Sequence, residues 1–208
     1  TYGAPWSIAS YADGCGASSP PSGFGSRVAA WGADRAAAAD VLDECVLVVG
    51  PSGKTPLSGD VGTGFGLGLA MLEDWVIVGM PYAEEAAGCD ANGTGCALAI
   101  PYTDGTWSLD DAQILDGLDL EWAGLGVAAG GTRIIVAGLA AGTDTEVAAD
   151  AEGDACSYVL SSGTWTLEGC LAAEVTRGAD DGFACTLHPV TSCAIAISES
   201  GTTVAIGA

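Results

Sequence analysis

The chain has 208 residues, of which 49% are hydrophobic and 15% are charged, so it can bury a core and is not a disordered polymer. Its 27 Asp and Glu against 5 Lys and Arg give a formal net charge of −22 at pH 7. Because this charge repels phosphate, nucleic acid is excluded as a favoured partner and anionic membranes are disfavoured. No membrane insertion is expected either, since the apolar stretch 125–142 contains Arg133 and a Gly-Gly turn.

Residues 1–23 contain a tryptophan strand, Ala4-Pro5-Trp6-Ser7-Ile8, followed by a Ser- and Pro-rich linker. Residues 24–64 form a short, degenerate repeat that begins at Phe24-Gly25. Its alanine-rich part, 33–44, predicts one or two helical turns. The segment Gly50 to Thr55 resembles a phosphate-binding loop, but it has two residues too few and Pro56 follows it. It is therefore interpreted as a hairpin turn.

Residues 65–124 and 125–182 are the two full repeats, and each predicts two β-hairpins. Short β-branched runs alternate there with Gly-rich or acidic turns, which is the hairpin pattern. The apolar runs are nearly continuous, which predicts strands covered on both faces. The expected strand pairs are 65–71 with 75–79, 97–102 with 107–109, 125–128 with 134–138, and 157–160 with 165–167.

Residues 183–208 form a partial repeat, with a hairpin of 193–197 and 203–207 but no tryptophan hairpin after it. Tryptophan precedes the large apolar landmark by 18 residues three times, in the pairs Trp6 and Phe24, Trp107 and Leu125, and Trp165 and Phe183. We therefore expect an all-β, β-propeller-like array of about four repeats, or blades. The surplus strand of residues 1–23 would complete the last repeat of its own chain, closing a ring, or that of a neighbouring subunit, extending a fibre.

Eight cysteines, an even number, favour disulfides and an oxidising, extracellular compartment. Cys156 and Cys170 are equidistant from Gly163, so they would face each other across a hairpin. The other expected pairs are two loop staples, Cys89–Cys96 and Cys185–Cys193, and the remaining pair Cys15–Cys45.

One run of motifs resembles the FG-GAP repeat. It contains Phe-Gly-x-x-Leu-Ala at 65–70, an acidic turn at 73–74, Val-Ile-Val-Gly at 76–79 and Gly-Thr-Trp-Ser-Leu at 105–109. The resemblance covers most of residues 24–208 and is best in 65–115. It implies four-stranded blades, as in the β-propeller of integrin α-subunits, and an extracellular adhesive or structural role. Propellers of that family usually have about seven blades, whereas this chain supplies about four.

The resemblance also implies calcium, because FG-GAP blades often carry Asp-rich loops that surround a hard cation. No segment here has the alternating Asp pattern, so the alternative is that these acids are solvated turn residues. Asn92-Gly93-Thr94 is an acceptor sequence for N-glycosylation. The candidate calcium ligands are Asp144, Glu146, Asp150, Glu152 and Asp154.

Catalysis has little support in the sequence. His188 is the only histidine and belongs to no catalytic motif, while the acid pairs 110–111 and 180–181 are adjacent residues, which point to opposite faces of a strand. We expect a non-enzymatic, extracellular structural or adhesive protein that self-associates in a surface layer, appendage or filament. The alternative is a propeller module that binds a glycan or a protein through its loops, with or without calcium.

Overall fold

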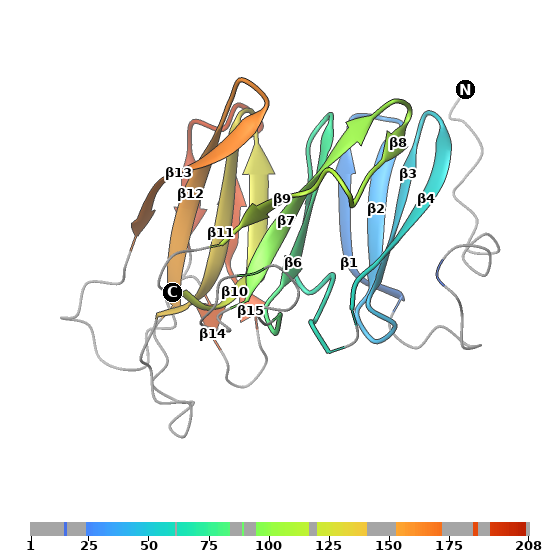
Figure 1. Ribbon diagram of the computed structural model, residues 1–208. Coiled ribbons are helices and arrows are strands. Elements are labelled where there is room, and N and C mark those ends of the chain that lie inside the picture. The colour runs from blue at the N-terminus through green and yellow to red at the C-terminus, as the bar shows by residue number, and fades with distance from the viewer. Residues whose placement is uncertain are drawn as a thin grey trace.

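The computed structural model describes residues 15, 24–60, 62–83, 89, 95–116, 120–140, 153–171, 185–186 and 192–206. These residues form an all-β structure of antiparallel sheets, which stand side by side in chain order (Figure 1). Among them there is no helix long and apolar enough to cross a membrane.

The first sheet is a four-stranded meander of β1 (Phe24–Trp31), β2 (Arg35–Asp40), β3 (Cys45–Gly50) and β4 (Gly53–Ser58). The prediction of helical turns in 33–44 is wrong, because this segment contains β2. Ala37 and Ala39 are buried against the next sheet, so the small side chains serve close packing and tertiary contacts override the helix propensity of alanine. The Gly50–Thr55 segment is a hairpin turn, as predicted.

The second sheet consists of β5 (Leu69–Met71), β6 (Trp75–Met80), β7 (Cys96–Thr103) and β8 (Thr106–Trp107), with β9 (Gln113–Leu115) also paired to β7. The third sheet is the meander of β10 (Leu120–Gly130), β11 (Arg133–Ala140), β12 (Gly153–Ser161) and β13 (Thr164–Leu171). The predicted pairing of hairpins is confirmed in both sheets, although the first strand of the second sheet starts only at Leu69.

Two shorter pairs follow. β14 (Cys185–Thr186) pairs with β15 (Ser192–Cys193), and β16 (Ile195–Ile197) pairs with β17 (Val204–Ile206). We call β16–β17 the terminal hairpin. It packs on β10 and β11 of the third sheet, in the same relation that each sheet has to the one before it.

The sheets meet at three apolar seams, to which successive residues of one strand contribute alternately. Val76 and Val78 face the first sheet across the first seam, whereas Ile77 between them faces the third sheet across the second seam. In β11, likewise, Ile134 faces the second seam and Ile135 faces the third, between the third sheet and the terminal hairpin. Central strands are therefore apolar on both faces, which explains the continuous apolar runs of the sequence.

Glycines let the backbones approach closely at the seams. A Cβ on Gly79 would lie 2.7 Å from the carbonyl carbon of Gly124 in the next sheet. In the first seam, a Cβ on Gly66 would lie 2.9 Å from the Cβ of Ala39. Both distances are far below van der Waals contact, so the seams require glycine at these positions.

The register of the sheets shows which residues of two repeats are equivalent. Val78 pairs with Leu69, and Val136, 58 residues later, pairs with Val127, also 58 residues later. The same shift relates Gly66, with φ 94°, to Gly124, with φ 91°. The structural counterpart of Phe65-Gly66 is therefore Ala123-Gly124, and the predicted landmark Leu125-Gly126 lies two residues too late. Correspondingly, β10 begins at Leu120, before the predicted repeat boundary.

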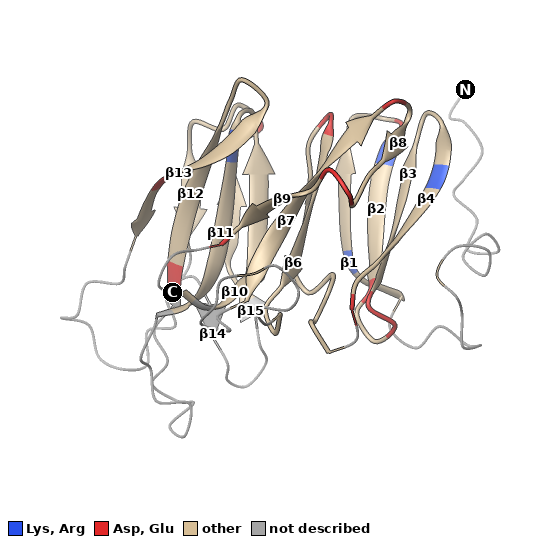
Figure 2. Ribbon diagram, in the orientation of Figure 1, with Lys and Arg blue, Asp and Glu red and all other residues tan. Residues whose placement is uncertain are grey.

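Acidic residues of the described chain gather at turns and strand ends (Figure 2). Two of them shape the chain between the first and second sheets. The buried carboxylate of Asp40 accepts the N–H groups of Leu42 and Asp43, at 3.2 and 3.3 Å. The carboxylate of Glu44 accepts the N–H groups of residues 62 and 64, both at 3.0 Å. These acids therefore fold the loops, in addition to contributing charge.

Candidate functional site

Disulfides tie the described chain at three places. Cys156 and Cys170 are register partners with Cα atoms 4.0 Å apart, as their symmetric spacing predicts. The expected pairs Cys89–Cys96 and Cys15–Cys45 are also present, with Cα separations of 5.6 and 5.9 Å. Cys193 is disulfide-bonded and its register partner is Cys185. Such a set of disulfides indicates an oxidising compartment.

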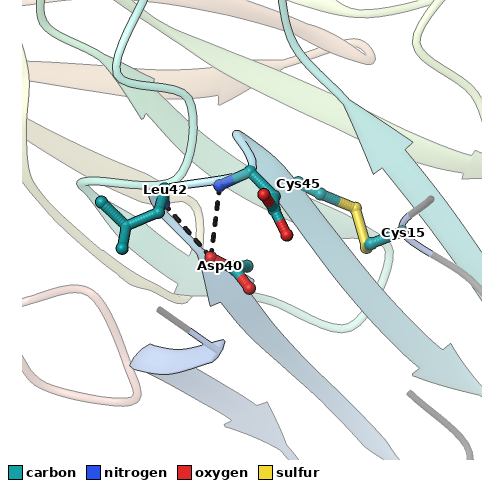
Figure 3. The surroundings of a disulfide bond; sticks show 5 residues. Cys15, Asp40, Leu42 and Cys45 are labelled. Atoms are coloured by element: carbon teal, nitrogen blue, oxygen red, sulfur yellow. Dashed lines mark hydrogen bonds between the residues drawn. A yellow bond between two sulfur atoms is a disulfide. The ribbon is translucent and has the colours of Figure 1, made fainter. Parts of the chain in front are cut away.

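The Cys15–Cys45 bond fixes residue 15 on the outer face of the first sheet. Both cysteines are buried there with Leu47, and Phe24 and Val49 pack against them. Figure 3 shows this disulfide beside Asp40, whose carboxylate holds the turn that precedes Cys45. The outer face of the first sheet is the face opposite the first seam, so this end of the array is held by a covalent bond.

Most of the predicted metal and modification sites lie outside the described residues. This applies to four candidate calcium ligands, to Asn92 and to His188. Asp154 is described; it lies in β12, half-buried, opposite Gly138 of β11. Within the described ranges, no group of three or more His, Cys, Asp or Glu side chains could hold a metal ion. The four ligands concerned are Asp144, Glu146, Asp150 and Glu152.

Of the acid pairs considered for catalysis, 110–111 lies in the bend between β8 and β9, where Asp111 accepts the hydroxyl of Thr103 at 3.4 Å. The pair 180–181 lies outside the described residues.

One position at the start of the second strand recurs in all three sheets and reaches across the following seam. It is occupied by Arg35, Trp75 and Arg133, each two residues before a buried residue of the same seam. The guanidinium of Arg35 lies 5.1 Å from the ring centroid of Tyr102 in the second sheet. Trp75 packs edge to face on Trp165 of the third sheet, with ring centroids 5.6 Å apart. In the first two seams, this position is therefore covered by an aromatic ring of the next sheet.

Arg133 is at the same position in the third seam, but no aromatic ring of the described residues covers it. Its guanidinium donates to Gly201 O of the terminal hairpin at 3.1 Å and to both carboxylate oxygens of Glu168, at 2.7 and 3.0 Å. Ser157 donates to the same carboxylate. The side chain of Arg133 is 34% exposed, compared with 14% for Arg35.

The terminal hairpin covers only part of the third sheet, and a groove of about 320 Å³ lies beside it. The groove is bordered by β17 and by the face of β12 and β13, without any residue of β16. It is therefore located where the third and fourth strands of a fourth sheet would pack. The residues that line it are Arg133, Ile135, Ala155, Ser157, Glu168, Gly169, Cys170, Leu171, Gly201, Thr202, Val204 and Ile206.

The ion pair at the groove shifts the pKa values of both partners. Hydrogen bonds from Arg133 and then from Ser157 lower the pKa of Glu168 below its usual value. The hydrogen bond and charge of Glu168 raise the pKa of Arg133. Both groups are therefore charged at neutral pH, and the groove combines a balanced pair of charges with apolar walls.

Sequence reasoning did not predict this groove. The signal that could have found it is the recurrence of a large side chain at the first residue after each turn, at 35, 75 and 133. That recurrence is visible only when the strands are aligned by the 58-residue shift, and the 60-residue shift between Phe65 and Leu125 conceals it.

No protein-family model matches the chain, and a comparison with curated proteins finds no significant relative. The FG-GAP resemblance consequently stands on the motifs of the chain itself.

Proposed function

We propose that this chain is a non-enzymatic, extracellular structural or adhesive repeat protein of FG-GAP type, and a building block of a surface layer, appendage or filament. Its sheets correspond to blades of a propeller-like array that this chain does not complete alone. Self-association supplies the missing contacts, with strand pairing and apolar seams as the source of affinity and no need for a catalytic pocket.

The observation that carries this proposal is the unequal filling of the seams. Two seams join complete four-stranded sheets, whereas the third joins a four-stranded sheet to a two-stranded hairpin. Within the described chain, β17 has a strand partner on one side only. A strand with one free edge presents unpaired N–H and C=O groups, to which another extended segment can add. The N-terminal tryptophan segment of the same or of a neighbouring chain would be that segment.

Three further features agree with the proposal. The disulfides suit secretion, as expected for an extracellular building block. The net charge of −22 keeps isolated copies soluble and makes their association depend on ionic strength. The alanines and glycines at the seams make a rigid stack, which suits a mechanical role better than a site that must open and close.

Sedimentation velocity at several protein concentrations, in 50 mM and 1 M sodium chloride, tests the proposal. We expect polymers that grow with concentration and persist in high salt, because salt screens the repulsion between acidic copies and leaves apolar contacts intact. A discrete monomer under all these conditions would contradict it. That outcome would favour the alternative of a module that binds a glycan or a protein.

A further inference from the structure

We propose that the groove of the third seam binds the extended segment around Trp6 of a second copy of this chain, with the indole over Arg133. This inference rests on the proposed self-association and specifies its site. The added segment lies along the free edge of β17 and continues the terminal hairpin as a third strand.

The first argument is the recurrence of the covered position. Arg35 lies under Tyr102, a residue of the third strand of the next sheet, and Trp75 lies against Trp165 of the fourth strand. Arg133 is at the equivalent place, but the terminal hairpin has no third or fourth strand. The repeat therefore requires an aromatic side chain over Arg133, on a strand that the described chain does not provide.

The second argument is the shape and chemistry of the groove. Its walls are apolar on both sides, with Ile135 and Ala155 on the third sheet and Val204 and Ile206 on β17. Leu171 at its rim is 60% exposed, an unusual position for a leucine at the end of a strand. The only charged groups of the lining are Arg133 and Glu168, which pair with each other. A segment without charge is the occupant that such a groove accepts at least cost.

The N-terminal segment fits these requirements. Residues 1–12 contain no Asp, Glu, Lys or Arg, although the whole chain has a formal charge of −22. The sequence around Trp6, Ala4-Pro5-Trp6-Ser7-Ile8, parallels Gly163-Thr164-Trp165-Thr166-Leu167, the start of β13. Five of the six tryptophans lie in the described sheets, and Trp6 is the one that does not.

The position of Cys15 favours a second copy over the chain's own segment. Nine residues separate Trp6 from Cys15, so they span at most about 30 Å when fully extended. Cys15 is bonded to Cys45 on the outer face of the first sheet. Packed sheets lie about 10 Å apart, so the groove is about 30 Å away through three layers and further around them. A second copy meets no such limit, and its segment joins the two ends of the array head to tail.

A pair of complementary variants of the full chain tests this inference. Leu171→Asp places a charge in the groove and leaves Trp6 intact, while Trp6→Ala leaves the groove intact. Because Leu171 is exposed, its replacement should not disturb folding, which circular dichroism would verify. Leu42→Asp is the matched control, since Leu42 is equally exposed, at 65%, in the β2–β3 turn of the first sheet.

We expect each of the two variants to sediment as a monomer alone and an equimolar mixture of them to form a one-to-one dimer. The peptide of residues 1–12 should dissociate this dimer, and the same peptide with Trp6→Ala should be weaker by roughly tenfold or more. The Leu42→Asp control should assemble as the unaltered chain does. Arg133→Lys keeps the charge but loses the planar group, so it should weaken peptide binding to the Trp6→Ala chain, whereas Arg35→Lys should not.

The outcomes separate the possibilities. Assembly of the Leu171→Asp chain alone, to the extent of the unaltered protein, would overturn the groove as the site and leave the proposed function intact. A mixture of the two variants that stays monomeric would overturn binding to a second copy. If the unaltered chain is also monomeric and does not bind the peptide, while the Trp6→Ala chain does, the groove takes its own chain's segment and the proposed self-association fails as well.

Discussion

The second and third seams are built on the same plan but differ in what covers the third sheet. On one face of this sheet, complete strands of the second sheet bury Ile134, Tyr158 and Trp165. On the other face, only two short strands pack on Ile135, and the side chains of β13 are mostly exposed. The same sheet therefore presents a finished core on one side and an unfinished one on the other. Packing of equivalent residues depends on the neighbour, so stability should be concentrated in the second seam.

The largest difference between the seams should appear when a large side chain is truncated on each face of β13. Trp165→Ala removes an indole that is buried against Trp75, and we expect it to lower the free energy of unfolding by about 3–5 kcal/mol. Leu171→Ala, on the third-seam face, should change it by less than about 0.5 kcal/mol. Guanidinium unfolding followed by tryptophan fluorescence and by circular dichroism measures both. Equal losses would show that the two faces do not differ.

A methyl group placed on a seam glycine should have the next largest effect. Gly79→Ala puts a Cβ against the backbone of Gly124, so we expect a loss of about 3 kcal/mol or a separation of the second and third sheets. Gly169→Ala is the matched control in β13, because no heavy atom lies within 4 Å of its added Cβ. It should be neutral or slightly stabilising in the same denaturation experiment. If Gly79→Ala is tolerated as well as the control, close backbone approach does not define the second seam.

The buried hydroxyl of Tyr158 gives a smaller effect with an opposite sign at high pH. Burial, and then the charge of Asp116, raise the pKa of Tyr158 above its ordinary value of 10.0, and its hydroxyl has no hydrogen-bond partner in the described part of the chain. Tyr158→Phe should therefore be neutral or stabilising by up to about 1 kcal/mol near pH 7.

Linkage gives the direction of the pH effect at Tyr158. Above pH 10 the unfolded tyrosine loses its proton while the folded one keeps it, so the unaltered protein should lose stability relative to Tyr158→Phe as the pH rises. Thermal melts from pH 7 to pH 11 measure this difference. A constant difference across that range would contradict the burial of a neutral phenol in the second seam.

The smallest effect belongs to Glu168 at the open third seam. Its pKa is lowered from 4.5 by Arg133 and Ser157, so its stabilising contribution is present above pH 4.5 and is lost as the pH falls through the lowered value. We expect Glu168→Gln to melt slightly below the unaltered protein at pH 7 and at the same temperature near pH 3. Glu199→Gln, at an exposed glutamate of the terminal hairpin turn, should show no such convergence. A pH-independent difference at Glu168 would indicate a role in packing alone.

Several local features could be predicted because residues close in sequence specify them. The turns after Asp104 and Ser162, which adopt φ 52° before a glycine, define the tryptophan hairpins. The same short range explains the correct pairing of Cys156 with Cys170, since both are counted from one turn. The expected calcium ligands, apart from Asp154, and the glycosylation site lie outside the described residues, so these hypotheses remain predictions.

By itself, the sequence determined an all-β chain of hairpin pairs joined by disulfides, because alternation, turn residues and cysteine spacing act over a few residues. Only the tertiary structure decided that the alanines of β2 form a strand, that Gly124 is the counterpart of Gly66, and that Arg133 borders an unfilled groove. Each of these depends on what lies across a seam, at least 27 residues away in the chain for Ala39 and Gly66. A short stretch of sequence holds no record of its distant neighbour, and packing against that neighbour selects among the local conformations that the sequence allows.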